Sequence, residues 1–450
     1  MSTTQWRMPA LWLLPFLAGA LASAQAPAPG NEQFAVRVVA SGLENPWEML
    51  WGPDGRIWIT ERTGKRVVRV NPVDGAISPA LTVPDVMQKL GQDGLLGMAF
   101  HPDLLRNKGS DFVYLAMTYD SDPGPAEVRR LRIRRYTYDS RTQTLGSPRD
   151  IVSGLPAGSD HISGRLVFGR DQKLYLTVGD GGFNQLSLYC QPIRAQELPT
   201  AAEIAASDFQ HYQGKILRIN LDGSVPADNP TLGGVRSHIY TYGHRNAQGL
   251  IVAPNGRIYA SEHGPSIDDE LNLIVRGKNY GWPYVAGYKD DQVYEYTNWS
   301  ASAPTPCSSL KYTERVAPAS VPHQKESAWN DPAFMPPLRT FFTVPNDFDF
   351  STQQFVTIAP SGIDLYASTA IPGWARSILV TSLTRGTIYR VKLNPAGDAA
   401  VGQTLEYFNS TDRYRDVLVA PDGRTIFTVT DAAGQGRPTH PGSLLAFTLK

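Results

Sequence analysis

The chain has little cysteine, no excess charge of either sign and no long apolar segment. Its 450 residues include two cysteines, and 42 basic and 42 acidic side chains give a formal net charge of +0 at pH 7. This balance argues against a nucleic-acid partner or a polybasic membrane role. The arginine-rich run at residues 129–135 alternates with Leu131 and Ile133, which predicts a β-strand with one solvated face rather than a binding patch.

The scarcity of cysteine and of metal motifs argues against a zinc protein. Neither a CxxC pair nor an HExxH pattern occurs, so structural or catalytic zinc is not expected. Cys190 and Cys307 could pair in an exported protein, but nothing in the sequence brings them together. The sequence therefore leaves both the paired and the free state open.

The apolar stretch at the N-terminus is too short to span a membrane. Arg7 precedes an apolar run at residues 10–21, and Ala22-Ser23-Ala24 follows as a small-residue cleavage site. A membrane span needs about 20 apolar residues, whereas this arrangement is typical of a secretory signal peptide. We predict a signal peptide at residues 1–24, a flexible mature N-terminus at residues 25–33, and a soluble protein in the periplasm or outside the cell.

Helical patterns are also scarce, and residues 198–209 are the main candidate for a helix, as an excursion between repeats. Instead, a turn followed by a β-strand recurs six times. In each copy Pro, Gly, Asp or Asn supplies the turn, and β-branched and aromatic residues supply the strand. The copies begin at Trp51, Phe100, Phe168, Ala253, Ala359 and Ala420.

Six strand-rich units predict an all-β fold, a six-bladed β-propeller with long inter-strand loops on one face. We expect this fold to occupy residues 34–450 as a single catalytic domain, with residues 283–344 as the longest insertion. Because blades around an axis bring one loop of each unit together, functional groups should gather there.

Polar clusters lie where the predicted strands run into those loops. Taken one by one, they could be turn formers, strand-end caps or solvated charges. Taken together, they predict a central pocket with a histidine base and several arginines, which suits a ligand that carries carboxylates. The clusters are residues 91–94, 160–161, 179–185, 243–246, 262–265 and 413–416.

A second polar, turn-rich region spans residues 277–291. Its carboxylates Asp290 and Asp291, with Glu270 before it and loop carbonyls around it, suit a hard cation such as Ca²⁺. A solvated loop would carry the same residues, and the spacing is not that of an EF-hand. The residues alone leave both interpretations open.

The clusters, in this order, resemble the soluble quinoprotein glucose dehydrogenases, a family that uses pyrroloquinoline quinone (PQQ) and Ca²⁺. The resemblance is dense and colinear from Phe34 to Lys450. The segments that carry it are Asn45-Pro46-Trp47, Gly94-Leu95-Leu96-Gly97, Asp160-His161, Tyr242-Gly243-His244-Arg245-Asn246, Asn279-Tyr280-Gly281-Trp282-Pro283, Ala286-Gly287-Tyr288-Lys289-Asp290-Asp291 and Arg413-Tyr414-Arg415-Asp416-Val417.

The resemblance implies a catalytic centre in the axial pocket of the propeller. His161 would take the proton from the anomeric hydroxyl of an aldose, Asp160 would support His161, and Arg245 would stabilise negative charge on the quinone. Hydride would pass from C1 of the sugar to C5 of PQQ, giving the lactone, and an external acceptor would take the electrons. The residues implied to bind the cofactor are Gln92, Asp160, Arg245, Asn246, Arg413 and Arg415.

The resemblance also implies metal ligands and a homodimer. The backbone carbonyls of Gly264 and Pro265 would bind the Ca²⁺ that accompanies the cofactor. Structural calcium toward a dimer interface would be bound by Glu270, Tyr280, Ala286, Tyr288, Asp290 and Glu326.

Two departures from the family bear on the cofactor and the sugar. Thr384 stands where the family has a lysine that contacts a PQQ carboxylate, and Arg385 beside it could compensate. The loop before Thr357 is shorter than in the glucose enzymes and carries Phe355 in place of a tryptophan. The sequence therefore supports the catalytic groups better than it supports a particular sugar.

Two other functions fit the same scaffold. The departures at Thr384 and before Thr357 favour a calcium-dependent sugar-binding propeller without redox activity. A metal-dependent lactonase is the other alternative, since fold does not fix function, but the arginine-rich pocket counts against it.

Overall fold

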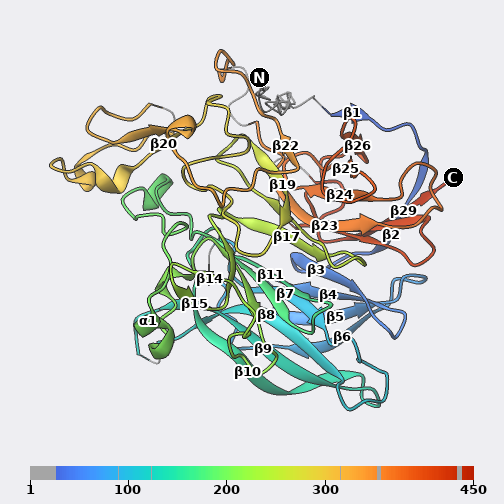
Figure 1. The fold of residues 1–450 in the computed structure, drawn as a ribbon. Helices are drawn as coiled ribbons and strands as arrows, with labels where there is room; N and C mark the ends of the chain where they lie inside the picture. Colours follow the sequence, from blue (N-terminus) through green and yellow to red (C-terminus); the bar gives the residue numbers. More distant parts are fainter. Residues whose placement is uncertain (1–26, 90, 123, 315, 352–355, 433–437) are drawn as a thin grey trace, which may run out of the picture.

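The structure, a computed structural model, describes residues 27–89, 91–122, 124–314, 316–351, 356–432 and 438–450. Six antiparallel sheets are arranged in a ring with very little helix (Figure 1), which confirms the predicted all-β, six-bladed propeller. The predicted signal peptide lies outside the described residues. In the part of the chain that the structure describes, no helix is long and apolar enough to cross a bilayer.

The first three blades follow one another along the chain, and each runs outward from the axis in sequence order. Blade 1 consists of β3 (Pro46–Trp51), β4 (Ile57–Glu61), β5 (Arg66–Val70) and β6 (Ile77–Thr82). Blade 2 consists of β7 (Leu95–Phe100), β8 (Phe112–Asp120), β9 (Arg129–Asp139) and β10 (Thr144–Pro156). Blade 3 consists of β11 (Ser163–Phe168), β12 (Leu174–Val178), β13 (Lys215–Ile219) and β16 (Ile239–Tyr242).

The other three blades complete the ring. Blade 4 consists of β17 (Ala247–Val252), β18 (Ile258–Glu262), β19 (Asp269–Ile274) and β22 (Arg339–Phe341). Blade 5 consists of β23 (Pro360–Tyr366), β24 (Ser377–Ser382), β25 (Ile388–Lys392) and β26 (Leu405–Tyr407), with β1 (Ala28–Pro29) added in parallel. Blade 6 consists of β27 (Tyr414–Val419), β28 (Thr425–Thr430), β29 (Leu444–Leu449) and β2 (Phe34–Ala40).

The remaining elements are short and lie in the loops. They are β14 (Thr231–Leu232), β15 (Val235–Arg236), β20 (Glu295–Thr297), β21 (His323–Lys325), α1 (Ala201–Ala206), η1 (Leu186–Leu188), η2 (Gln210–Tyr212), η3 (Trp299–Ala301), η4 (Cys307–Ser309) and η5 (Glu326–Ala328).

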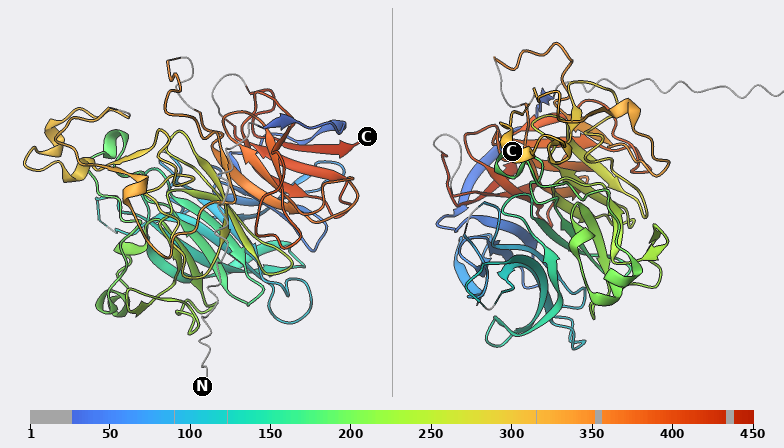
Figure 2. Two further views of the ribbon diagram at one scale, coloured as in Figure 1. Left: turned by 45° about the horizontal axis from the view of Figure 1, so that its top comes forward. Right: turned by 90° about the vertical axis from the view of Figure 1, so that its left-hand side faces the viewer.

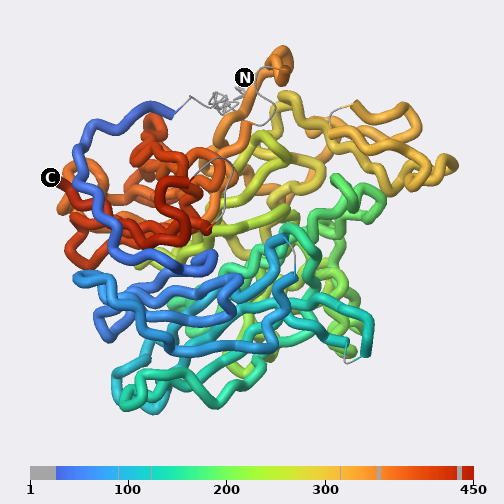
Figure 3. The backbone as a smooth tube through the Cα atoms, turned by 180° about the vertical axis from the view of Figure 1, so that it is seen from behind, coloured from blue at the N-terminus to red at the C-terminus, as the bar shows by residue number. Residues whose placement is uncertain are grey.

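The two ends of the described chain close the ring. The N-terminal strand β2 pairs antiparallel with β29, so the blue and red segments run side by side in Figure 3. Closure in this way leaves no long free edge between the first and last blades. Residues 27–33, from the segment expected to be flexible, lie along blade 5, where Glu32 accepts hydrogen bonds from Tyr407 (2.6 Å) and Trp374 (2.8 Å).

The recurring turn motif forms the same hairpin in different blades. In blade 1 the Asp54 carboxylate accepts hydrogen bonds from the Arg56 amide and from Trp58 Nε1, and Gly55 has a φ of 75°. In blade 3 the corresponding Asp171 accepts a hydrogen bond from the Tyr175 hydroxyl at 2.8 Å. The aspartate therefore shapes the turn and also anchors an aromatic side chain of the next strand.

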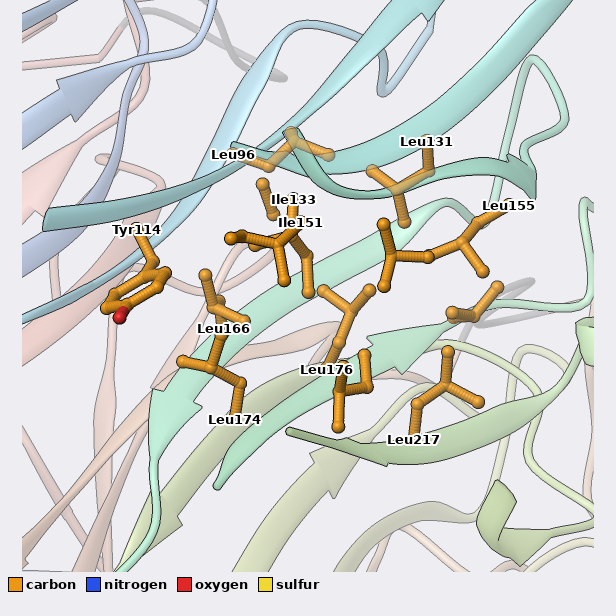
Figure 4. Packing of buried hydrophobic residues seen from close by; sticks show 14 of the residues in the cluster. Leu96, Tyr114, Leu131, Ile133, Ile151, Leu155, Leu166, Leu174, Leu176 and Leu217 are labelled. Carbon is orange, nitrogen blue, oxygen red and sulfur yellow. The ribbon is translucent and has the colours of Figure 1, made fainter. Parts of the chain in front are cut away.

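Neighbouring blades pack face to face through apolar side chains. Figure 4 shows this contact between blades 2 and 3, where Leu96, Leu131 and Ile133 lie over Leu166 and Leu176, all of them fully buried. The innermost strands β3, β7, β11, β17, β23 and β27 each contact the next in a closed circle. The ends of these strands therefore surround the axis at which the site lies.

For the copy of the motif that begins at Ala359, the predicted strand is present, but the predicted turn before it is wrong. β23 begins at Pro360, so Pro360-Ser361-Gly362 belongs to the innermost strand of blade 5. A Cβ atom at Gly362 would lie 1.6 Å from Asp416 Oδ1, so glycine is needed here because blade 6 approaches closely.

Two further expectations also need correction. The predicted helix is present as α1, but it lies within blade 3, between β12 and β13, rather than between blades. The arginine-rich run forms β9 with Leu131 and Ile133 buried, yet its other face is not simply solvated. Arg132 is 5% exposed, because it bonds to Asp85 in the loop between β6 and β7 and lies 4.3 Å from the ring of Tyr119 in β8.

The longest insertion leaves blade 4 between β19 and β22. Its hairpin of β20 and β21 projects from the body as an arm, visible at the left of Figure 1 and again in Figure 2. Cys190 and Cys307 form a disulfide with a Cα–Cα distance of 5.7 Å, which joins this arm to the loop after β12. The question that the sequence left open is thus answered in favour of pairing.

Candidate active site

His161 lies between β10 and β11 with 6% of its surface exposed and a φ of 42°. Its Nδ1 is 2.7 Å from Asp180 Oδ1, and its Nε2 is 3.2 Å from Gln185 Nε2. Because Gln185 Oε1 accepts a hydrogen bond from Arg245 Nη2 (2.8 Å), the Gln185 amide nitrogen must donate to His161. His161 therefore carries its proton on Nδ1 and presents an acceptor lone pair at Nε2, the form a general base requires.

The carboxylate that holds the imidazole is Asp180, which the sequence did not single out. Asp180 is fully buried and also accepts hydrogen bonds from Trp282 Nε1 and the Gly182 amide, both at 2.9 Å. Asp160, the expected partner, instead accepts from the His161 backbone amide at 2.9 Å and from Gln92 Nε2 at 2.5 Å. Asp160 therefore fixes the backbone turn, and Asp180 fixes the ring.

Arg245 and Asn246 lie beside this group, at the start of blade 4. Arg245 Nη1 reaches the His263 carbonyl at 3.4 Å, and its guanidinium lies 5.3 Å from the ring of Trp282. Asn246 Oδ1 accepts from Ser163 Oγ and from Gln248 Nε2, each at 3.0 Å. The predicted residues of blades 1 to 4 therefore do meet at the axis.

A cavity of about 530 Å³ opens next to these residues. Gln92, His263, Arg413 and Arg415 line it, and Arg62 does so as well, which the sequence did not indicate. Arg415 binds Asp431 through two nitrogens, at 2.7 and 3.1 Å, and Arg413 reaches Asp431 at 3.4 Å and the Leu383 carbonyl at 3.0 Å. Among the described lining residues Asp431 is the one acid, so three guanidinium groups face a single carboxylate.

The residues around this cavity fit the anionic quinone that the resemblance implies. The donors Arg245 Nε and Asn246 Nδ2, and the ring nitrogen His263 Nε2, are buried and have no hydrogen-bond partner among the described residues. Burial, followed by the charge of Arg245, lowers the pKa of His263 well below its ordinary value, so His263 adds no charge of its own. Unpaired donors and excess positive charge at one place suit a rigid ligand with carbonyl oxygens and carboxylates.

A second cleft of about 370 Å³ shares Gln185 and Arg245 with the histidine site and extends under the arm. Besides those two, its lining is rich in aromatic rings with a polar rim. These residues are Phe183, Trp282, Tyr294, Tyr296, Trp299, Tyr312, Phe348 and Phe350, with Asn184, Glu295, Glu314, His323 and Asn346. Hydrogen bonds fasten the arm here in addition to the disulfide, from Tyr189 Oη to the Leu310 carbonyl, from Asn184 Nδ2 to the Thr297 carbonyl and from the Trp299 amide to Asn184 Oδ1.

Gly264 and Pro265, the expected ligands of a cofactor-linked calcium ion, lie close to Arg245. They line a small cavity together with His263, Glu270 and Arg245. In the described residues no group of three or more His, Cys, Asp or Glu side chains is arranged to hold a metal ion. Calcium at this place would thus depend on backbone carbonyls, as the resemblance implies.

The second predicted calcium region gathers carboxylates that form no ion pair with any of the described residues. Glu326 accepts from the amides of Ala286, Asp290 and Asp291 at 2.9–3.1 Å, and burial raises its pKa from 4.5 to about 7. Burial also raises the pKa of Asp268 well above its ordinary value, and the charges of Asp290 and Glu326 add to that rise. Several carboxylates buried together, all negative when ionised, suit a divalent cation.

The other residues predicted for this region surround the same carboxylates. Glu270 accepts from the Gly287 amide and from Asn272 Nδ2, each at 2.7 Å, and burial raises its pKa. Tyr280 uses its hydroxyl to donate to the Leu273 carbonyl at 2.6 Å, and Tyr288 is half-buried. The hydroxyl of Tyr280 is therefore already engaged within the fold.

The departures at residues 384 and 385 are local. Thr384 Oγ1 donates to the Thr357 carbonyl at 2.9 Å, and the Arg385 guanidinium lies 4.3 Å from the ring of Phe342. Neither residue lines the 530 Å³ cavity, so Arg385 does not replace the missing lysine there. Phe355 lies outside the described residues.

The fold and the site together define the class of this protein, a six-bladed propeller with a histidine base, arginines and unpaired hydrogen-bond donors around its axis. Comparison with known proteins identifies the family. The chain matches the family described as Glucose / Sorbosone dehydrogenase over residues 43–340 and 346–439, and it belongs to this family.

Individual relatives extend this assignment. The chain is 44% identical over 442 residues to quinoprotein glucose dehydrogenase B of Acinetobacter calcoaceticus, covering 93% of this chain and 92% of that protein. It is 26% identical over 430 residues to aldose sugar dehydrogenase YliI of Escherichia coli, covering 94% and 96%. The PQQ-bound aldose sugar dehydrogenase from Streptomyces coelicolor has a similar structure, with a TM-score of 0.63, 26% identity and coverage of 94% and 100%. The resemblance seen in the sequence is thus confirmed.

Proposed function

We propose that the protein is a PQQ- and Ca²⁺-dependent aldose dehydrogenase, which oxidises glucose-like sugars at C1 to the lactone and passes the electrons to an external acceptor. The observation that carries the proposal is the His161 imidazole, which Asp180 holds at Nδ1 so that Nε2 is the acceptor, beside a cavity rich in arginine. Family membership and the names of the relatives support the same chemistry.

Each residue has a physical task in this reaction. His161 Nε2 takes the proton of the C1 hydroxyl, and the Asp180 carboxylate stabilises the imidazolium that forms. Arg245 holds a fixed positive charge where negative charge develops, and Gln185 links it to His161. Bound PQQ supplies the two-electron acceptor, because side chains cannot carry that chemistry themselves.

The other residues hold the cofactor and the substrate. Arg413 and Arg415 bind carboxylates of the cofactor, while Gln92 and Asn246 offer amide contacts. The carbonyls of Gly264 and Pro265, which line a small cavity with Arg245, would bind the Ca²⁺ that the cofactor requires. The sugar reaches His161 through the 370 Å³ cleft, which shares Gln185 and Arg245 with the histidine site.

Reconstitution tests the proposal. Purified apo-protein should gain sugar-dependent dye reduction when PQQ and Ca²⁺ are added together. No turnover with any of several aldoses would show that the protein is not such an enzyme, and a PQQ titration followed by absorbance would then separate a sugar-binding propeller from an enzyme. Lactone hydrolysis without PQQ would indicate the lactonase alternative instead.

A single substitution tests the base. His161→Ala should leave PQQ binding largely intact and reduce kcat about 10²–10⁴-fold, because a positioned base contributes that factor. Wild-type activity in this variant would remove His161 from its role.

Export and assembly are separate proposals. Cleavage after Ala24 would release the protein to the periplasm or the medium, which N-terminal sequencing of secreted material tests. The homodimer rests on family likeness, and size-exclusion chromatography with light scattering tests it.

A further inference from the structure

Arg62 lies at the cavity from a different blade than Arg413 and Arg415. It follows β4 of blade 1, and its backbone is held on both sides, by Arg62 N–H to the Asn45 carbonyl (2.9 Å) and by Leu95 N–H to the Arg62 carbonyl (3.1 Å). Its Nη1 donates to the carbonyls of Gly91 (2.9 Å) and Asp93 (3.2 Å). The guanidinium is therefore placed by a rigid backbone and bonded through one nitrogen.

The nearby carboxylates are already engaged by other arginines. Asp431 is bound by Arg415 and Arg413, and the Asp93 carboxylate is bound by Arg129 at 3.0 Å. Within the described residues Arg62 forms no ion pair, and its remaining nitrogens donate to no residue. The cavity lining thus contains three guanidinium groups and one carboxylate, an excess of two positive charges.

The electrostatics point in the same direction. Burial and then repulsion by Arg415 lower the pKa of Arg62, with Arg413 adding to the repulsion. Asp431 offsets only part of the positive charge of the three arginines, so their packing raises the free energy of the empty site, and an anion bound among them lowers that cost. Thr384 and Arg385 place no charge at the cavity, so among its described lining residues Arg62 is the cation available besides the two arginines of blade 6.

We propose that Arg62 is a further cofactor-binding arginine besides Arg245, Arg413 and Arg415, which bonds a carboxylate of the bound quinone from blade 1 while it holds the Gln92 loop against it. This inference rests on the proposed function, because it assumes that the anionic ligand of the cavity is PQQ. The same side chain then performs two tasks, since Gly91 and Asp93, which accept from Nη1, flank Gln92.

The experiment measures PQQ binding and stability separately. Wild type, Arg62→Gln, Arg62→Lys and the control Arg385→Gln are titrated with PQQ in the presence of Ca²⁺ and followed by absorbance, and the melting temperature of each apo-protein is recorded. Loss of a charge-assisted hydrogen bond predicts a Kd about 10- to 100-fold higher for Arg62→Gln. Arg62→Lys should lose less, because the charge remains, and Arg385→Gln should bind as wild type.

The melting temperature distinguishes cofactor binding from a structural role. If Arg62 serves the cofactor, apo Arg62→Gln melts close to the wild-type temperature, because the loss of the bonds to the Gly91 and Asp93 carbonyls is offset by the removal of one of three crowded charges. A lower melting temperature in both Arg62 variants would assign the affinity loss to a collapsed loop and overturn the inference. If wild type binds PQQ and Arg62→Gln binds it with the same affinity, the inference about Arg62 is overturned and the proposed function is not. Failure of the wild type to bind PQQ would overturn the proposed function as well.

Discussion

Replacing Asp180 by asparagine should remove most of the activity while leaving the fold and the cofactor site in place. Asp180 accepts three hydrogen bonds, from His161 Nδ1 (2.7 Å), the Gly182 amide (2.9 Å) and Trp282 Nε1 (2.9 Å). All three partners are donors, so a carboxylate satisfies every one of them. Asp180→Asn brings an amide group whose two donor hydrogens must face one of these partners.

Both orientations of the new amide are unfavourable. If its nitrogen faces His161, the imidazole proton is forced onto Nε2 and the base is lost. If its nitrogen faces Trp282, two buried donors oppose each other, which costs about 1–3 kcal/mol of folding stability, and a neutral oxygen no longer stabilises the imidazolium. A carboxylate-to-amide exchange beside a catalytic histidine of serine proteases lowers kcat about 10⁴-fold, and we expect a loss of ~10²–10⁴ here.

The assay is kcat for dye reduction at saturating glucose in the reconstituted holoenzyme, measured from mildly acidic to mildly alkaline pH. PQQ affinity and the melting temperature are measured in parallel. The matched control is Asp160→Asn, the substitution that the sequence favoured. Asp160 contacts the backbone amide of His161 and Gln92, so its effect should be the smaller of the two.

A full kcat with an unchanged pH profile in Asp180→Asn would refute the reasoning, because the assigned tautomer and charge would then not matter. A larger kcat loss in Asp160→Asn than in Asp180→Asn would also contradict it. Reduced activity that follows reduced PQQ affinity alone would place Asp180 in cofactor binding instead.

Three further predictions follow from other contacts. Cys190→Ser should lower stability by ~2–5 kcal/mol, since the disulfide closes a long loop, and should raise KM for sugar more than it lowers kcat, because the arm walls the cleft; equal KM values would contradict this. Arg245→Lys should lower kcat about 10²–10³-fold, since the bond to Gln185 and the fixed charge are both displaced; stopped-flow measurement of cofactor reduction checks this. Burial raises the pKa of Glu326 from 4.5 to about 7, so the folded state holds that proton more tightly than the unfolded state does. Calcium-free protein should therefore lose about 3 kcal/mol of folding stability as the pH rises between those two values. Melting curves with EDTA and with Ca²⁺ should differ most above pH 7.

Much of the fold could be predicted because its signals are local. A turn aspartate and the aromatic residue that it anchors lie four positions apart, as Asp54 and Trp58 do. The residues that determine each hairpin therefore lie within a short segment of the chain. The count of blades follows from counting these stretches. The copy at Ala359 was misread because Gly362 serves a contact with Asp416 in the next blade, and no local pattern distinguishes that role from a turn.

The candidate site was predicted only in part, because some of the contacts that complete it are not local. Adjacency in sequence pointed to Asp160 as the partner of His161, but adjacent residues share a backbone contact, and the ring reaches the end of β12 instead. Asp180 lay within the polar cluster at residues 179–185, so the signal for its presence existed but the signal for its role did not. Arg62 gave no signal, since one arginine after a strand is usual on a surface.

By itself, the sequence determined the propeller, the polar character of its axial loops and the choice of a histidine base, because these depend on residue types and short-range spacing. The tertiary structure decided which carboxylate holds the imidazole, that Cys190 and Cys307 meet across 117 residues, and that arginines of blades 1 and 6 share one cavity. Such pairings depend on how six separate sheets close into a ring, and the distance between two side chains is set by that closure rather than by their positions along the chain.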